Sequence, residues 1–170
     1  NDETINELIM VFHDIAHDDC VLSAIVTGAG NKAFIAGADV AELAKNDATA
    51  AKRTAQKGQL LTILVENLGK PVIAAVNGYA LGGGCEIIEA ATLAVASDKA
   101  RMGQPEINLG FNPCWGGTQR LTRLVGRKKA MEMVLTGDMI DAHEALRVGL
   151  VNMVVPHEKL METAEELARK

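Results

Sequence analysis

The 170-residue chain contains 48% hydrophobic and 23% charged residues, a balance typical of a globular protein that can bury a substantial core, so disorder is not the default. Its net charge of −5 gives no basic footprint for nucleic acid, although local Lys/Arg clusters could still meet an anionic ligand. The three cysteines, Cys20, Cys85 and Cys114, are an odd number without CxxC spacing. This pattern favours free thiols over a disulfide framework or a zinc site.

No apolar run approaches the ~18 residues of a membrane span, and no signal peptide is visible. We therefore expect a cytoplasmic protein built as one domain over residues 1–170. The chain begins with Asn1 rather than Met, so the sequence is also compatible with a targeting segment lost from its start.

Helical and strand patterns alternate through the first half of the chain. The long helix is expected to turn Leu60, Leu61, Leu64 and Val65 inward, because these residues recur at the helical period. A polar, alanine-rich surface connection over 46–51 should precede it. The expected elements are an amphipathic helix over 3–16 capped by Asp2, a buried strand over 21–27, a short helix over 40–44 opened by Asp39, and the long helix over 50–68.

The second half continues the alternation, which argues for an α/β fold with parallel strands. A strand over 71–76 leads through a glycine turn into a helix over 83–91. A hairpin-like or loop region is expected over 102–109. The remaining elements are a strand over 93–96, helices over 116–124, 127–135 and 141–148, a strand over 151–155 and a final amphipathic helix over 158–169.

Several local motifs have weak functional readings. GAGNKA at 28–33 matches the GxGxxA dinucleotide turn, but no helix pattern follows it. His13 and His17 are four residues apart and could chelate a metal, yet they more simply lie on a solvated helix face. His143-Glu144 lacks the second histidine of HExxH, and neither Ser23 nor Ser97 stands in a nucleophile-elbow sequence. Metal catalysis and serine hydrolysis are therefore not favoured.

The glycines at 82–84 are the stronger signal. At a strand-to-helix junction they let a ligand approach the backbone and leave N–H groups free at the helix start, which suits an oxyanion. The alternative is a tight turn that only packs well. Glu86 follows in the first helical turn among apolar neighbours, so burial would raise its pKa toward an acid–base range. Glu89, one turn further on, serves as an internal control, because no motif places it at the site.

A second carboxylate, Glu106, follows Pro105, whose fixed backbone helps to aim the side chain. Two oriented carboxylates are what an enzyme that adds or removes water requires. One of them can activate water while the other gives or takes a proton.

With these motifs in place, the chain resembles the crotonase (enoyl-CoA hydratase/isomerase) superfamily, hydratase branch. The resemblance covers nearly the whole chain. The matching segments are AFIAGADV at 33–40, KPVIAAVNGYALGGGCE at 70–86, GQPEINLG at 103–110, GGTQRL at 116–121 and EALRVGLV at 144–151.

The resemblance implies a crotonase-like (ClpP/crotonase) fold of repeated ββα units, assembled as a trimer or a dimer of trimers. It implies that Glu86 and Glu106 are the catalytic pair that adds water to a 2-enoyl-CoA, with no cofactor or metal. The backbone N–H groups of Ala38 and Gly83 would form the oxyanion hole for the thioester carbonyl. The positions that would contact the acyl-CoA are Ala36, Asp39, Val40, Gly82, Pro113, Cys114 and Trp115.

Other reactions of the superfamily stay open: isomerisation, thioester hydrolysis and hydration of a cyclic dienoyl-CoA. So does an inactive remnant that only binds CoA or oligomerises. The chain departs from hydratases at Cys114-Trp115, which replaces the usual Gly-Ala and puts bulk beside the acyl site. Ala41, Glu89 and Thr92 also differ from common family residues, and the usual first strand and C-terminal helices are missing from both ends.

Overall fold

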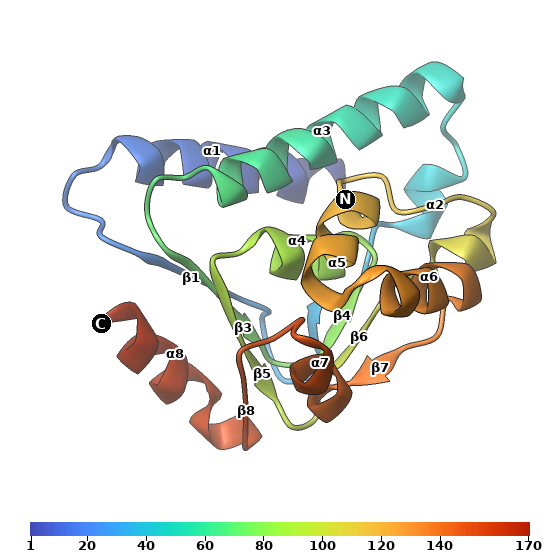
Figure 1. The fold of residues 1–170 in the computed structure, drawn as a ribbon. Coiled ribbons are helices and arrows are strands. Elements are labelled where there is room, and N and C mark those ends of the chain that lie inside the picture. Colours follow the sequence, from blue (N-terminus) through green and yellow to red (C-terminus); the bar gives the residue numbers. More distant parts are fainter.

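The computed structural model describes residues 1–170 as two four-stranded sheets surrounded by helices (Figure 1). The first sheet has the order β1-β3-β5-β8 and is entirely parallel. The second has the order β2-β4-β6-β7, in which only β7 is antiparallel to its neighbour. The strands are β1 Ala24–Thr27, β2 Ala33–Ile35, β3 Val72–Val76, β4 Tyr79–Leu81, β5 Leu93–Ser97, β6 Arg101–Gly103, β7 Ile140–Asp141 and β8 Met153–Val155.

The chain passes from one sheet to the other in each repeat. A strand of the first sheet is followed directly by a strand of the second, and then by a helix. The three repeats are β1-β2 with α3 (Ala48–Glu66), β3-β4 with α4 (Gly83–Ala90), and β5-β6 with the 3-10 helix η1 (Pro105–Leu109) and α5 (Gly117–Val125). The predicted α/β fold of ββα units is therefore confirmed.

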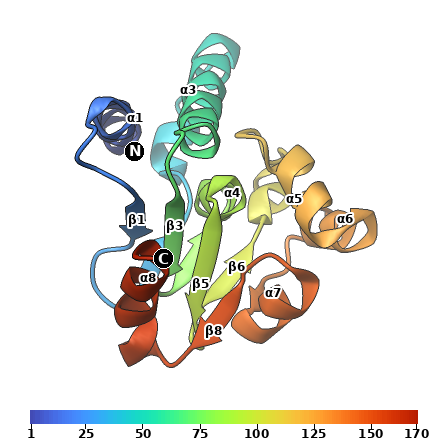
Figure 2. The ribbon, with the colours of Figure 1, turned by 60° about the vertical axis from the view of Figure 1, so that its left-hand side comes forward.

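The core is layered around β3, whose five residues are all buried. Val72, Ala74 and Val76 face the larger apolar cluster on the side of α4, whereas Ile73 and Ala75 face α8 (Leu160–Ala168). This alternation follows from the two-residue period of a strand. Figure 2 shows α8 and α4 on opposite sides of the first sheet, with α1 (Asp2–His17) and α3 lying above them.

The remaining helices are α2 Val40–Leu43, α6 Arg127–Thr136, α7 Ala142–Val148 and the 3-10 turn η2 His157–Lys159. Asp39 caps α2 as predicted. The first helix is capped by Asn1 rather than Asp2, because the Asn1 side chain accepts from the Thr4 N–H. No helix combines the length and apolar character that crossing a membrane would require.

Four further predictions about the elements were wrong. α3 begins at Ala48, capped by Asp47, so most of the expected 46–51 connection is helical. Leu60 is 47% exposed because it lies on the outer side of α3. β1 is a half-buried edge strand rather than a buried one. The 102–109 region is the end of β6 followed by η1, rather than a hairpin or irregular loop.

Candidate active site

The glycine turn between β4 and α4 brings the end of β2 against the start of α4. Gly82 has φ 55° and ψ −120°, a conformation that side-chain-bearing residues rarely adopt. A Cβ on Gly84 would overlap the Ile35 carbonyl oxygen, so only glycine lets β2 approach this closely. As a result, the 36–40 segment that follows β2 lies beside the first turn of α4.

Two backbone N–H groups at this junction, those of Gly83 and Ala38, have no backbone acceptor. Gly83 is the first residue of α4, a position whose N–H has no acceptor within the helix. The Ala38 N–H makes no hydrogen bond within the chain. The Asp39 carboxylate is used locally, since its Oδ1 accepts from Ala41 N at 2.8 Å. Ala36, Ala38, Asp39 and Val40 are all exposed, so a ligand can reach this segment.

Glu86 is 1% exposed and is held by the loop before α5. Its Oε1 accepts from the backbone N–H groups of Trp115 and Gly117, each at 2.7 Å. Its Oε2 has no hydrogen-bond partner in the chain. Burial raises the pKa of Glu86, while those two N–H donors and, less strongly, Arg120 act in the opposite direction.

Glu106 enters the same cluster from η1. Its Oε1 lies 2.8 Å from the point where a Cβ on Gly82 would stand, which places it at the glycine turn. Its Oε2 is buried and has no partner. Burial, with a further contribution from the nearby Glu86 charge, raises the pKa of Glu106 to about 7. Burial and the same two carboxylates raise the pKa of the Cys114 thiol to about 11, so Cys114 lies near both of them.

The loop that fixes Glu86 is itself held by α3. Thr62 Oγ1 donates to the Trp115 carbonyl oxygen at 2.6 Å, and Arg120 Nη1 donates to the same oxygen at 3.1 Å. Gln59 Nε2 donates to the Cys114 carbonyl at 2.8 Å. Sequence reasoning did not assign these residues a role. A signal was present, because positions 59, 62 and 66 form a polar stripe at helical spacing.

Trp115 is predominantly a packing residue in this structure, with 8% of its surface exposed. The indole lies between Gly58 of α3 and Gly83 of α4, and a Cβ at either glycine would overlap it. Pro113, which begins the same loop, is also buried. The bulk expected beside the acyl site is therefore directed between two helices, and it contacts the turn through Gly83.

The use of Glu89 as an internal control was wrong. Its side chain is 6% exposed and its Oε1 accepts from Gln104 Nε2 at 2.7 Å. Burial, followed by the Glu86 charge, raises the pKa of Glu89 well above its ordinary value. Glu89 therefore belongs to the same buried polar cluster as the predicted pair. Gln104, which is fully buried, is a further residue that sequence reasoning missed.

The other motifs have structural roles. The Asn77 amide donates to the carbonyls of Gly28 and Gly30, which fixes the 28–33 loop, and the strand β2 follows it rather than a helix. His17 Nδ1 forms a hydrogen bond with the His13 carbonyl oxygen at 2.8 Å on an exposed helix face. Thr92 Oγ1 accepts from Val72 N at 3.0 Å, so this family departure caps the start of β3.

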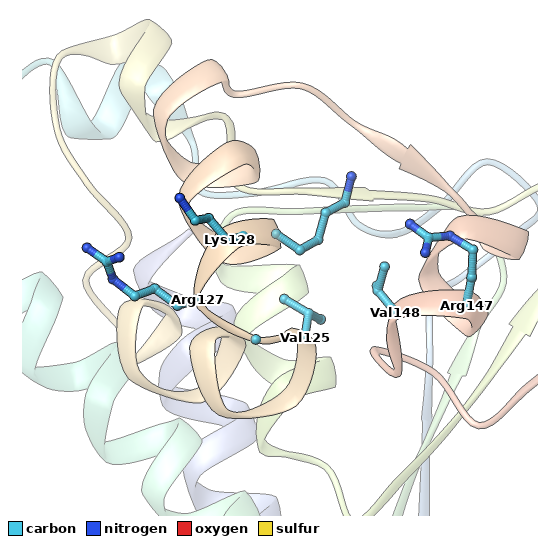
Figure 3. Close-up of a pocket in the computed structure, with 7 residues that line it drawn as sticks. Val125, Arg127, Lys128, Arg147 and Val148 are labelled. Atoms are coloured by element: carbon cyan, nitrogen blue, oxygen red, sulfur yellow. The ribbon is translucent and has the colours of Figure 1, made fainter.

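An open hollow of about 550 Å³ lies between the start of α6 and the end of α7, away from the carboxylates (Figure 3). Arg127 and Lys128 extend away from Arg147 there. Lys129 and Arg147 are both paired with Glu144, at 3.1 and 2.6 Å. Glu144 therefore partly neutralises the positive charge of the lysine and arginine side chains that line this hollow.

The two parallel sheets and their ββα repeats define a crotonase fold, with two buried carboxylates beside its glycine turn. The sequence model of the enoyl-CoA hydratase/isomerase family matches residues 1–170, so the chain belongs to this family. It is 48% identical to the short-chain-enoyl-CoA hydratase of Clostridium acetobutylicum, over 100% of this chain and 65% of that protein. The match to the crotonyl-CoA hydratase of Syntrophomonas wolfei is 44%, over 99% and 65%.

Solved structures agree with this assignment. The crystal structure of an enoyl-CoA hydratase from Bacillus anthracis superposes with a TM-score of 0.96 at 40% identity, covering 99% of this chain and 66% of that one. DspI from Pseudomonas aeruginosa gives the same TM-score at 36% identity, over 99% and 64%. The chain thus spans slightly less than two thirds of the length of these relatives.

Proposed function

We propose that this chain catalyses the reversible addition of water to a 2-enoyl-CoA, giving a 3-hydroxyacyl-CoA. One observation carries the proposal. Glu86 is fixed through one oxygen by two N–H donors and has no hydrogen-bond partner for its other oxygen, next to a Glu106 that also has no partner for one oxygen. Two relatives named as enoyl-CoA or crotonyl-CoA hydratases support the same reaction.

The charges of the pair suggest a division of labour. Burial and the Glu86 charge raise the pKa of Glu106 to about 7, so a substantial fraction of Glu106 is protonated near neutral pH and can serve as the acid. Glu86 then acts as the base that takes a proton from water as the water oxygen bonds to C3. Glu106 acts as the acid that delivers its proton to C2. The reverse reaction exchanges these two roles.

The thioester carbonyl would bind at the junction of β2 and α4. In this proposal the N–H groups of Ala38 and Gly83 donate to its oxygen as negative charge develops there. Losing one donor of such a pair costs about 3 kcal/mol of transition-state stabilisation. We propose that Ala36, Asp39, Val40 and Gly82 line the path of the acyl-CoA, and that Pro113, Cys114 and Trp115 shape the acyl end.

The test is to incubate the chain with crotonyl-CoA and to follow the loss of the conjugated thioester absorbance. Glu86→Gln and Glu106→Gln should each lower kcat by roughly 10²–10⁴-fold, the usual contribution of a general acid or base. Glu7→Gln, at an exposed position of α1, is the matched control and should match the wild type. If Glu106→Gln hydrates as fast as the wild type, this pair does not perform the reaction.

Product analysis separates hydration from the other reactions of the family. A 3-hydroxyacyl-CoA supports the proposal, whereas a shifted double bond or free CoA contradicts it. A folded chain that binds CoA but turns over no enoyl-CoA would be the inactive remnant.

We also propose that the chain forms a trimer or a dimer of trimers. Support comes from large apolar side chains that are exposed on η1 and the neighbouring α6, two elements that contact each other. They are Ile107, Leu109, Met131 and Leu135. Light scattering during size-exclusion chromatography would give the oligomer mass, and a monomer at micromolar concentration would contradict the proposal.

A further inference from the structure

A third buried carboxyl group lies one helical turn beyond Glu86. Glu89 is buried, with 6% of its surface exposed, and only one of its two oxygens has a protein hydrogen-bond partner by distance and angle. An unpaired ionised carboxylate in such a place is costly, and an apolar residue of similar size would carry no such penalty. The group therefore needs an explanation that its packing alone does not supply.

The pattern of unsatisfied atoms gives that explanation. Gln104 Nε2 donates to Glu89 Oε1 at 2.7 Å. The second oxygen of each group, Glu89 Oε2 and Gln104 Oε1, is buried without a donor. A carboxyl and an amide are both planar forks, so a protonated carboxyl can pair with an amide through two hydrogen bonds. A proton on Glu89 Oε2 would supply the one missing donor and satisfy both oxygens at once.

The electrostatic surroundings favour the neutral form. The charged or titratable groups that face Glu89 are Cys85 and Glu86 on its own helix and Arg120 on α5. From α3, the helix packed above, the buried residues are Gly58, Leu61, Thr62 and Val65, none of which titrates. Desolvation and the Glu86 charge both raise the pKa of Glu89, and they outweigh the opposing effects of the hydrogen bonds from Gln104 and the Cys85 thiol and of the Arg120 charge.

Gln104 connects this carboxyl group to the catalytic pair. Its side chain is fully buried, and it immediately precedes the Pro105-Glu106 start of η1. Gln104 Nε2 and Glu86 Oε1 both lie within 2.9 Å of the point where a Cβ on Gly117 would stand. The amide therefore lies beside Glu86 while its backbone leads into Glu106.

We propose that Glu89 is a positioning residue kept in its neutral, protonated form, which pairs with the Gln104 amide through two hydrogen bonds and so fixes the segment that carries Glu106. The protonated state does not depend on the proposed hydration, whereas the positioning role rests on it. Glu89 thus adds a rigid polar link without adding a second negative charge beside Glu86.

The first test measures the proton directly. In protein labelled with ¹³C at the glutamate carboxyl carbons, one carboxyl signal besides that of Glu106 should remain at its protonated shift at pH 7 and should be absent from Glu89→Gln. Glu7→Gln, the matched control, should retain it. If every carboxyl signal lost in Glu89→Gln is that of an ionised group at pH 7, the neutral form is overturned.

Stability gives an independent reading. A folded-state pKa above the unfolded value means that the native chain holds a proton that the unfolded chain has released. Stability should therefore fall as pH rises above the unfolded value near 4.5. The number of protons released on unfolding at pH 7 can be obtained from urea titrations at several pH values. This number should be smaller by about one in Glu89→Gln than in the wild type. An unchanged proton count would contradict the proposal.

The positioning role is tested by comparing Glu89→Gln with Glu89→Met. Glutamine can still accept from and donate to the Gln104 amide, whereas methionine removes both bonds. Glu89→Gln should keep kcat within about threefold of the wild type, and Glu89→Met should lower it at least tenfold and shift the Glu106 titration away from about 7. Equal kcat and equal Glu106 titration in the two variants would overturn the role. A wild-type chain without hydratase activity would instead count against the proposed function, while the carboxyl signals could still be read.

Discussion

Gly58 of α3 offers a sharp test of how the loop that holds Glu86 is fixed. It lies in the interior of a 19-residue helix, where alanine is usually favoured over glycine by about 1 kcal/mol. The Trp115 indole, however, occupies the space that an alanine methyl group would need. The ring cannot simply withdraw, because three of its carbons also lie within 2.9 Å of a would-be Cβ on Gly83. Helix propensity and packing therefore make opposite predictions for Gly58→Ala.

Overpacking a rigid buried contact costs typically 1–3 kcal/mol, and the upper end applies here because the ring lies between Gly58 and Gly83 and close to both. After the gain in helix propensity, Gly58→Ala should destabilise the protein by about 2 kcal/mol. In a Trp115→Ala background the obstacle is absent, and the same change should stabilise by about 1 kcal/mol. The two substitutions should thus be coupled by about 3 kcal/mol, at the upper end of what contacting residues show.

The assay is urea unfolding of the four proteins in this cycle, followed by far-ultraviolet circular dichroism. Ala51→Gly, at an exposed position of the same helix, is the control for helix propensity and should cost about 1 kcal/mol in both backgrounds. If Gly58→Ala stabilises the wild type, or if the two changes are additive within about 0.5 kcal/mol, the indole does not pack on α3 as described.

Three further predictions concern the carboxylates and their supports. Because Glu106 must be protonated to act as the acid, kcat/KM should fall as pH rises through about 7, and a flat profile to pH 9 would contradict this role. Gly117→Ala would press a methyl group within 2.9 Å of the Glu86 carboxylate, so kcat should fall by roughly 10²-fold while the circular dichroism spectrum stays unchanged. Thr62→Val removes the hydroxyl that donates to the Trp115 carbonyl, which should cost about 1–3 kcal/mol in urea unfolding; an unchanged midpoint would refute that bond.

The sequence predicted elements correctly where apolar residues follow a regular pattern or where several glycines and carboxylates occur close together. Buried strands such as β3 are continuous apolar runs, and the glycine turn with its two flanking carboxylates stands out in any single sequence. The three-residue strands β2, β4 and β6 were not predicted, because so few residues show no alternation and their pairing depends on distant partners. Assignment of the oxyanion hole to Ala38 and Gly83 remains a prediction.

Glu89 shows why local reasoning misjudged part of the site. A glutamate one turn from Glu86 looks like a helical surface residue in isolation, and its only polar partner, Gln104, comes 15 positions later. The relation becomes visible only once α4 and the start of η1 lie side by side. The polar stripe on α3 was overlooked for a similar reason, since its acceptors belong to a loop more than fifty residues away.

Trp115 has a practical consequence, since it is the only tryptophan in the chain. Its backbone N–H donates a hydrogen bond to Glu86, and its carbonyl oxygen accepts hydrogen bonds from Thr62 and Arg120. Its ring lies against Gly83. Tryptophan fluorescence therefore arises from a single point, within the loop that orients Glu86. An acyl-CoA or a substitution that moves this loop should change the emission without any added label, so site geometry and global unfolding can be followed in one optical channel.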